Sequence, residues 1–513
     1  MSHAFTSDVL PDAGVDDLMA DFASAVADGP DRIAVVHDGT AVTYRELAER
    51  IHHVAWRARA HRLAAGSSGR IGATVSHTPA VVEHLLGILE AGATYCPIDD
   101  ALPDGRKRAL AEVLELDCVH GLVADACDAV PESLRDVGGP TEPGTSWRPS
   151  DGAYVLCTSG STGVPKPVVI SRLALTTTVR SLRQLFALTP RDRVLQFASL
   201  GWDTCLEEIL PALTTGAALI FDDEAHSGSF PRFLRMVAER RITVLDLPTA
   251  FWHELVLFLH EERVGLPDTV RLVVIGGERV DPTRLRQWRE SSTGDVVLLN
   301  TYGCTETTMI THSVTLAGPG AEPGLEVDGA EAPLGRPLPH VRDHVTDDGE
   351  LLVSGPCLAS GYLGLAELTA AGFPILDHGS GDTRWFRTGD LVVRGQRGLL
   401  HSRGRVDDQV KVSGVRVHPA EVEAQLTTHP AVAAAVVMGE RRLAQTSLTA
   451  YVVTDGSVTS AELKRHLRDR LPSQFVPRTV KFVEALEYTS SGKIDRAATQ
   501  RAATANQNEG AIR

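Results

Sequence analysis

The most informative stretch of the chain is Thr158-Ser159-Gly160-Ser161-Thr162-Gly163-Val164-Pro165-Lys166. Its small residues allow backbone N–H groups to approach a ligand closely, and its hydroxyls and lysine suit the oxygens of a polyphosphate. The spacing differs from the G-x-x-x-x-G-K-[ST] motif of P-loop hydrolases, because Lys166 follows Gly163 by three residues and precedes Pro167. The stretch therefore predicts a nucleotide-binding loop of another kind, with a flexible linker as the alternative.

Strand-like and helix-like patterns alternate along most of the chain. Short apolar runs occur at Ala153–Cys157, Val194–Phe197, Ala217–Phe221, Ile242–Leu245, Leu272–Ile275 and Val296–Leu299. Helical periodicity covers Tyr44–Ala60 and Pro79–Ala91, and this alternation is typical of parallel α/β sheets. Downstream of Gly349 the pattern is rich in strands and turns, and after Arg405 it predicts strand, helix, strand, strand, helix, strand. We expect a frayed tail from Ala502.

Length and charge limit the class of protein. The chain has 513 residues and a formal net charge of −16 at pH 7. This length fits two or three domains, and the charge argues against bulk affinity for nucleic acid or anionic membranes. No apolar stretch approaches the length of a membrane span, and the first residues lack the pattern of a signal peptide. The seven cysteines are scattered, without a C-x-x-C pair or zinc spacing. We expect a cytoplasmic protein with reduced thiols and with no nucleic-acid or membrane partner.

Seven short segments are informative because all of them occur in one particular order, whereas any one of them alone could arise by chance. They are Val42–Leu47, Ala91–Asp99, Thr158–Lys166, Asn300–Glu306, Arg387–Leu391, Gly404–Asp407 and Ser491–Asp495. Together they resemble the adenylate-forming superfamily and, within it, the amino-acid adenylation domains of nonribosomal peptide synthesis, over roughly residues 30 to 500. The resemblance implies an α/β and α+β fold. Its parts would be a large N-terminal domain at 1–403 with parallel α/β sheets and a small β-barrel-like subdomain, a hinge at 404–408, and a small mobile α+β domain at 409–513.

Enzymes of this family carry out two half-reactions. A carboxylate attacks the α-phosphate of ATP to give an acyl-adenylate and pyrophosphate, and a carrier thiol then takes the acyl group. Two anions meet in the first step, so cations and hydrogen-bond donors have to lie where negative charge builds. The resemblance assigns this task to Lys493, whose compact ammonium suits a contact between two anions; a solvated surface lysine is the alternative. It also places Asp407 at the pivot between adenylating and thioester-forming arrangements.

The resemblance also implies a site for ATP and Mg²⁺. Asp390 offers two acceptor oxygens to a ribose, while Tyr302 offers a flat face and Asn300 an amide to adenine. Thr305 offers a hydroxyl to the α-phosphate, and Glu306 a hard oxygen ligand to Mg²⁺. The alternatives are a core position for Tyr302, and a helix cap at Thr305 with Glu306 in the first turn. The predicted ATP-binding set is Thr158, Ser159, Gly160, Ser161, Thr162, Gly163, Lys166, Gly277, Asn300, Tyr302, Gly303, Thr305, Asp390 and Arg405.

A group of acids marks the predicted substrate pocket. Asp203 takes the place of the family aspartate that pairs with the amino group of an amino acid. Glu207 lies four residues later, so in the first turn of a helix the two carboxylates would share a face. Asp246 follows the run Ile242–Leu245 and adds a third acid, where parallel sheets bind ligands. By carry-over the pocket comprises Asp203, Thr204, Glu207, Asp246, Val274, Gly276, Thr301, Met309, Ile310 and Lys493.

Three acids without an aromatic wall predict a basic substrate. An apolar amino acid would leave buried carboxylates unpaired, and truncating one partner of such a pair costs about 2–5 kcal/mol. A capping box formed by Thr204 and Glu207 is the alternative account of Glu207. The pocket composition resembles that of β-lysine-activating adenylation enzymes of peptide-antibiotic pathways. In β-lysine, Asp203 would pair with one ammonium while Glu207 and Asp246 hold the other, and lysine or ornithine could pair similarly.

Three residues depart from the family pattern. Pro167, Arg172 and Cys304 replace the usual Gly, His and Pro, and Pro167 removes one N–H donor. Two rival functions stay open. A degenerate nucleotide or amino-acid sensor is disfavoured by the retained Lys493, and a coenzyme-A-dependent acyl ligase would not need Asp203.

The partners follow from the resemblance. No Gly-Gly-x-Ser carrier segment follows Lys493, so we expect a freestanding enzyme that loads a separate phosphopantetheinylated carrier protein. An MbtH-like helper is a further candidate partner.

Overall fold

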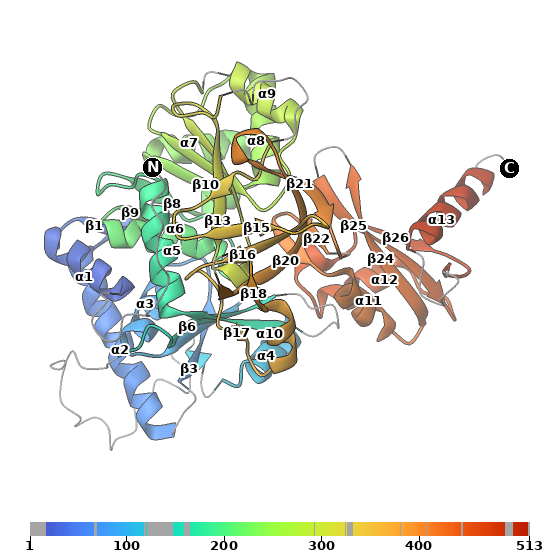
Figure 1. Cartoon of the computed structure of the whole chain (residues 1–513), viewed down its shortest axis with the longest axis horizontal. Coiled ribbons are helices and arrows are strands. Elements are labelled where there is room, and N and C mark those ends of the chain that lie inside the picture. Colours follow the sequence, from blue (N-terminus) through green and yellow to red (C-terminus); the bar gives the residue numbers. More distant parts are fainter. Residues whose placement is uncertain are drawn as a thin grey trace.

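The computed structural model describes residues 17–65, 69–116, 119–120, 147–158, 165–291, 293–323, 325, 332–379, 381–407, 409–442, 445–487 and 496–510. The described residues form two large sheets with their helices, a smaller antiparallel sheet and a C-terminal α+β unit (Figure 1), and the strands of the two large sheets are interleaved along the chain. None of the helices in these ranges combines the length and apolar character that crossing a bilayer requires.

The largest sheet within the described ranges has nine strands. Their order is β14 (Arg336–Pro337), β13 (Ile310–Ala317), β12 (Val297–Gly303), β11 (Leu272–Gly276), β10 (Val244–Pro248), β8 (Arg193–Leu195), β9 (Ala218–Phe221), β1 (Ile33–His37) and β2 (Thr40–Thr43). The strands from β12 to β1 pair in parallel, whereas β13, β14 and β2 pair antiparallel. The prediction of parallel sheets is therefore confirmed for the centre, and the sheet as a whole is mixed.

A second sheet shares this mixed character. Its order is β17 (Gly361–Tyr362), β7 (Lys166–Ser171), β6 (Gly152–Thr158), β4 (Thr94–Asp99), β3 (Arg70–Val75) and β5 (Val119–His120). The strands from β6 to β5 are parallel, and β7 and β17 are antiparallel. The nucleotide-loop stretch begins at the end of β6 and ends at the start of β7, so the sheet holds both of its ends.

Helices cover the two large sheets. They are α1 (Leu18–Asp28), α2 (Tyr44–Ala65), α3 (Ala80–Glu90), α4 (Asp104–Val113), α5 (Arg172–Leu185), α6 (Thr204–Thr215), α7 (Phe230–Glu239), α8 (Thr249–Glu262) and α9 (Pro282–Glu290). Successive strand residues of the nine-stranded sheet belong to different cores: Val274 packs in the core that contains α5 and α6, and Val273 in the core that contains α7, α8 and α9. Side chains alternate between faces in a strand, so burial of both faces explains the continuous apolar runs.

A third region is antiparallel. Strands β15 (Arg342–Val345), β16 (Glu350–Ser354), β20 (Phe386–Arg394) and β21 (Leu400–Arg405) form one sheet, and α10 (Ala366–Gly372) precedes the pair β18 (Ile375–Asp377) and β19 (Asp382–Arg384). The strand-rich pattern downstream of Gly349 is thus confirmed, while the barrel-like subdomain stays a prediction. The predicted hinge at 404–408 overlaps the end of β21, where Gly404 and Arg405 still pair with β20.

The C-terminal unit has a hydrophobic core of its own. It comprises β22 (Val410–Val412), β23 (Val415–Val417), α11 (Pro419–Thr427), β24 (Val432–Arg442), β25 (Gln445–Thr454), α12 (Ser460–Arg468), β26 (Thr479–Phe482) and α13 (Arg496–Gly510). The predicted division into a large N-terminal and a smaller C-terminal domain is confirmed (Figure 1), and the bounds 1–403 and 409–513 stay predictions. Two details differ. A hairpin replaces the first predicted strand, and the tail expected to fray from Ala502 continues as helix to Gly510.

Candidate active site

Three neighbouring parallel strands bring predicted pocket residues together. In register, Asp246 on β10 lies opposite Val274 on β11, and Gly276 on β11 lies opposite Thr301 on β12. A Cβ on Gly276 would lie 2.5 Å from the Thr301 hydroxyl, so any larger residue there would force Thr301 to shift. Strand β10 ends at Pro248, two residues beyond Asp246, rather than before Asp246 as the apolar run suggested. The pocket residues therefore lie at the edge of the sheet where α/β proteins bind ligands.

Two of the predicted acids touch each other. Glu207, in the first turn of α6, hydrogen-bonds with Asp246, and both side chains are buried. Burial raises the pKa of Asp246 to about 7. Burial and the neighbouring Asp246 raise the pKa of Glu207 well above its usual range. Asp246 Oδ2 has no hydrogen-bond partner in the described part of the chain, so the pair is two acids without a cation.

Asp203 lies beside this pair, at the N-cap of α6. Its side chain hydrogen-bonds with Thr305, and burial raises the pKa of its carboxyl to about 6. It caps no N–H of the helix, and Thr204 is an exposed first helical residue rather than a cap. The capping-box account of Glu207 is therefore wrong, and Glu207 instead faces Asp246.

A fourth acid went unrecognised in the sequence. Glu208 is 1% exposed and accepts hydrogen bonds from the backbone N–H groups of Phe197 and Ala198, both at 3.0 Å, and from Gln196 Nε2 at 3.0 Å. It fixes the chain after β8, which leads into Asp203. The available signal was the pair of adjacent acids in the otherwise apolar helix that begins at Thr204.

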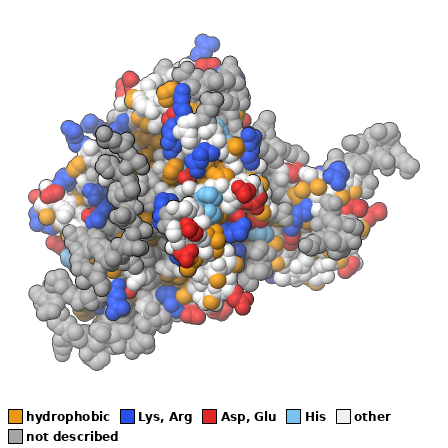
Figure 2. All heavy atoms as spheres, viewed as in Figure 1, with side chains coloured by type: hydrophobic (Ala, Val, Ile, Leu, Met, Phe, Trp, Pro, Cys, Tyr) orange, Lys and Arg blue, Asp and Glu red, His pale blue; other side chains and the backbone are white. Residues whose placement is uncertain are grey.

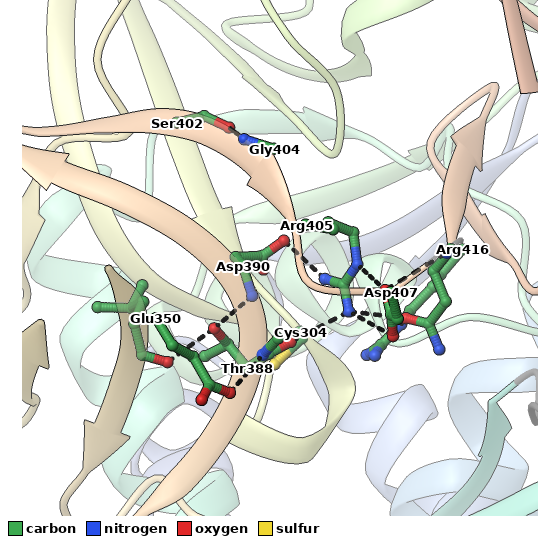
Figure 3. Close-up of polar contacts among 12 residues, drawn as sticks. Cys304, Glu350, Thr388, Asp390, Ser402, Gly404, Arg405, Asp407 and Arg416 are labelled. Atoms are coloured by element: carbon green, nitrogen blue, oxygen red, sulfur yellow. Dashed lines mark hydrogen bonds and ion pairs between the residues drawn. The ribbon is translucent and has the colours of Figure 1, made fainter. Parts of the chain in front are cut away.

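Asp390, which is predicted to bind the ribose, accepts hydrogen bonds from two residues. Tyr302 Oη donates to Asp390 Oδ2 at 2.6 Å. Arg405 Nη1 donates to Asp390 Oδ1 at 2.6 Å (Figure 3). Arg405 also donates to Asp407 Oδ1 at 2.6 Å. Burial alone would raise the pKa of Asp407, but Arg405 and Arg416 hold it below its usual value. The structure thus joins the ribose candidate to the predicted hinge residue through one guanidinium.

The adenine candidates are buried. Tyr302 belongs to the hydrophobic core. It therefore occupies the core position given above as the alternative, and it also hydrogen-bonds with Asp390. Asn300 donates through Nδ2 to the carbonyl of Pro333 at 2.8 Å, and its Oδ1 has no partner among the described residues. That oxygen is an acceptor that a ligand amine could use.

The metal candidate Glu306 already has two partners. Its Oε1 accepts from the Tyr362 hydroxyl at 3.1 Å, and its Oε2 accepts from Arg416 Nη1 at 3.2 Å. No group of three or more potential metal ligands occurs in the ranges that the structure covers. Thr305 is the first residue of a short 3₁₀ turn, Thr305–Thr307, whose cap is Cys304. The cap alternative for Thr305 is therefore wrong, although Glu306 does lie in the first turn.

Of the remaining predicted residues, some are described by the structure and others lie outside the described ranges. Thr158 and Lys166 pair in register at the facing ends of β6 and β7, and burial together with Arg416 lowers the pKa of Lys166. Met309 is buried with a φ of 66°, next to Ile310 at the start of β13, which pairs with Gly303 on β12. Outside the described residues lie Ser159, Gly160, Ser161, Thr162, Gly163 and Lys493.

The hairpin β22–β23 of the small domain reaches this site, which the motifs did not indicate. Lys411 Nζ lies 5.8 Å from the ring centroid of Tyr302, and the Gly414 N–H donates to Glu278 Oε1 at 2.6 Å. Burial lowers the pKa of Lys411. Gly277 has a φ of 84°, and a Cβ there would lie 3.3 Å from Gly414 Cα, so glycines permit the close approach of the two domains.

A cavity of about 390 Å³ lies between the domains. Its walls include Asp99, Arg106 and Trp202 from the large domain and Leu471 and Gln474 from the small one. Trp202 directly precedes Asp203 and packs against the core of the small domain. One wall of the cavity is therefore formed by the residue that precedes the acid predicted to bind the substrate amine.

Comparison with known proteins identifies the family. Residues 22–363 match the family of AMP-binding enzymes, and residues 421–493 match the AMP-binding enzyme C-terminal domain. The chain belongs to the AMP-binding enzymes. It is therefore a member of a family of adenylate-forming ligases, and the two matched ranges lie in the large and the small domain.

This AMP-binding enzyme is similar in sequence to parts of large synthases. Isonitrile lipopeptide synthase of Streptomyces coeruleorubidus is 41% identical over 478 residues, which cover 90% of this chain and 32% of that protein. Tyrocidine synthase 3 of Brevibacillus parabrevis is 33% identical over 492 residues, covering 91% of this chain and 7% of that protein. The chain thus spans less than a third of these relatives. An artificially fused adenylation–PCP di-domain, NpsA-ThdA from Klebsiella oxytoca, has the same fold, with a TM-score of 0.76, 24% identity, and coverage of 90% and 93%.

Proposed function

We propose that this enzyme activates a basic diamino acid, with β-lysine as the first candidate, to its aminoacyl-adenylate. It then transfers the aminoacyl group to the phosphopantetheine thiol of a carrier protein in nonribosomal peptide antibiotic synthesis. A cytoplasmic location and a contribution from an MbtH-like helper are part of the same proposal. The family supports the adenylation, and the acids of the pocket support the class of substrate.

The buried pair Glu207–Asp246 carries the choice of substrate. Each carboxyl group has a raised pKa because it is buried, and the two share a hydrogen bond, which requires a proton between them. A substrate ammonium can replace that proton and pair with both carboxylates. An apolar side chain would leave the carboxylates desolvated and unpaired, which is costly. The pocket therefore favours a cation.

A second acid for a second amine favours a diamino acid. Asp203 hydrogen-bonds with Thr305, on the nucleotide side of the pocket, whereas Glu207 pairs with Asp246 on β10. An amino group near the reacting carboxylate would pair with Asp203, and the distal ammonium would pair with Glu207 and Asp246. In β-lysine these amines are on the β and ε carbons; lysine and ornithine carry the same two charges at other spacings.

The first half-reaction joins the substrate carboxylate to the α-phosphorus of ATP. A bond forms from a carboxylate oxygen to that phosphorus, and the bond from the phosphorus to the oxygen bridging to the β-phosphate breaks as pyrophosphate leaves. Asp390, fixed by Tyr302 and Arg405, would accept the ribose hydroxyls. Lys166 would lie near the phosphates, and we assign the contact with both anions to Lys493. Preorganised cations at these points stabilise the charge that develops.

The residues present fit a single Mg²⁺ held mainly by ATP. Mg²⁺ in ATP sites usually takes one or two carboxylates and otherwise phosphates and water, and it neutralises phosphate charge there. Glu306 would be its carboxylate ligand. In the present arrangement Arg416 occupies Glu306 Oε2, so the ligand becomes available when the hairpin withdraws.

The second half-reaction needs a path for a thiol. The sulfur attacks the carbonyl carbon of the adenylate, a thioester bond forms, and the bond to the phosphate oxygen of AMP breaks. The cavity between the domains is lined by Trp202, the residue before Asp203, and we infer that it opens toward the acyl end of the pocket. The hairpin β22–β23 meanwhile packs on the nucleotide residues. We therefore take the arrangement seen here as the thioester-forming one.

Amino-acid-dependent exchange of pyrophosphate into ATP tests the proposal. The panel is β-lysine, lysine, ornithine, arginine, leucine, phenylalanine and benzoate, each with and without an added MbtH-like helper. We expect exchange with the diamino acids, strongest with β-lysine. The variant Glu207→Leu should lower kcat/KM for the diamino acids by about 100-fold or more, because it leaves an ammonium without its partner. Glu239→Leu, at an exposed acid of α7, is the matched control.

Each other result has a distinct meaning. Preference for lysine or ornithine would retain the pocket and discard only the β isomer. Preference for leucine or benzoate would refute the acidic pocket. ATP binding without exchange under any condition would favour the degenerate sensor, and a product formed with coenzyme A but not with a carrier would favour the acyl ligase.

A further inference from the structure

One ion pair between the domains lies apart from the reacting groups. Arg106 on α4 of the large domain donates through Nη2 to Glu421 Oε1 on α11 of the small domain at 2.8 Å. The side chain of Arg106 is 13% exposed and that of Glu421 is 0% exposed. Most ion pairs at protein surfaces contribute little because water screens them, but a pair removed from water is not screened.

Among the residues that the structure describes, the other hydrogen bonds between the domains involve the site itself. Arg416 pairs with Glu306, and Gly414 donates to Glu278. Arg106 instead lines the cavity between the domains, and Glu421 follows the hairpin on α11. Neither contacts the acids of the pocket or the residues around Asp390. The pair can therefore be altered without removing a group that binds substrate or nucleotide.

Glu421 depends on this one cation. Burial raises the pKa of its carboxyl, and Arg106 opposes that rise. Its second oxygen, Oε2, has no hydrogen-bond partner in the part of the chain that the structure describes. A carboxylate in such a position is stable when its cation is present and costly when the cation is removed. In any arrangement that moves α11 away from α4, both charges would regain water instead.

We propose that Arg106 and Glu421 are positioning residues for the second half-reaction. Their ion pair holds the small domain against α4 in the arrangement that this step requires. This inference rests on the proposed function. The pair stabilises only the arrangement in which the hairpin β22–β23 contacts Tyr302 and the cavity reaches Trp202. Rotation about 404–408 for the first half-reaction breaks it. A conformational equilibrium shifts only through interactions that differ between its states, and this pair is such an interaction.

The test separates the two half-reactions in Arg106→Met and Glu421→Gln. Pyrophosphate exchange reports the first, and single-turnover transfer from enzyme-bound aminoacyl-adenylate to carrier reports the second. We expect transfer to slow at least about tenfold in both variants, with exchange within about twofold of the parent. The double variant should be no slower than the singles, because the two residues act as one pair. Thermal unfolding verifies that each variant is folded.

Two control variants match the chemistry of the change. Arg108→Met removes an exposed arginine from the same helix, α4, and should alter neither half-reaction. Glu423→Gln, two residues after Glu421 on α11, weakens an ion pair with Arg496 inside the small domain. It should not change the ratio of the two rates, because that pair does not cross between the domains.

The outcomes decide the matter. Equal loss of exchange and transfer, or no loss of transfer, in the folded variants would overturn the proposal. If the parent itself exchanges with no amino acid, the proposed function fails, and tryptic cleavage at Arg403 and Arg405 then tests the pair alone. Faster cleavage in Arg106→Met and Glu421→Gln than in the parent and Arg108→Met would support the ion pair, and equal rates would refute it.

Discussion

At the scale of single residues, the most informative group is the Asp246 carboxyl. Its pKa is raised to about 7 by burial, and a proton shared with Glu207 occupies the place that we assign to a substrate ammonium. The sign of the pH effect follows. Below about pH 7 Asp246 is protonated as well as Glu207, and the uncharged pair does not attract the cation, whereas above about pH 7 Asp246 is ionised and can bind it. The distal amine of the substrate, with a usual pKa of about 10.4, stays charged throughout.

We therefore expect KM for the diamino acid to fall as pH rises from about 6 to about 8, by up to about tenfold per unit below the pKa, and then to level off. KM is measured by pyrophosphate exchange at saturating ATP, with KM for ATP over the same range as the control. A KM for the diamino acid that is constant or rises across this range would contradict the exchange of a proton for a cation.

At the scale of elements, helix α6 carries two adjacent acids with opposite effects on stability. Glu207 faces Asp246, and no cation among the described residues pairs with either acid, so Glu207→Leu should raise the free energy of unfolding by about 1–4 kcal/mol. Glu208 accepts from the N–H groups of Phe197 and Ala198. Glu208→Leu would leave both unpaired and should lower stability by about 2–5 kcal/mol. Thermal unfolding without substrate measures both changes.

The pH dependence of these changes provides a second check. The Glu207 carboxyl binds its proton more tightly in the folded protein than in the unfolded chain, because its folded pKa is raised. Its favourable contribution is therefore present at low pH and is lost as pH rises from the unfolded pKa of about 4 toward the folded one. The gain from Glu207→Leu should be larger at about pH 8 than at about pH 5. A gain that shrinks with pH would place a cation beside Glu207.

At this scale the sequence predicted those elements whose pattern lies within a single segment of the chain. The six apolar runs became strands and both periodic segments became helices, because burial on two faces and on one stripe leave distinct patterns. The rule for parallel sheets predicted that β10 and β11 would share an edge, and Asp246 does lie there beside another residue of the predicted pocket, Val274. Antiparallel edges leave no such pattern, so the mixed sheets were missed. Glu208 was missed because its partners are backbone groups, which have no signature in the sequence.

At the scale of the whole molecule, the contacts between the domains were beyond the sequence. The quoted motifs identified Arg405 and Asp407, yet they did not indicate that Lys411 and Arg416 would lie against Tyr302 and Glu306. Such contacts depend on a rigid-body arrangement rather than on local pattern. On the face shown in Figure 2, acidic and basic side chains of the described residues are interspersed, rather than gathered into the single basic patch that favours nucleic acid.

The cavity between the domains leads to a prediction at the same scale. Gln474 lines it from the small domain, and Gln474→Trp would place an indole in its volume of about 390 Å³. If a carrier thiol uses this path, transfer should slow by about tenfold or more, because the arm would have to displace a side chain. Exchange should persist, since adenylation needs no thiol.

Thr427→Trp, at an exposed position of α11, is the matched control. Transfer at the parental rate in a folded Gln474→Trp variant would mean that the thiol enters elsewhere, and equal loss of exchange would mean that the cavity serves the adenylation step.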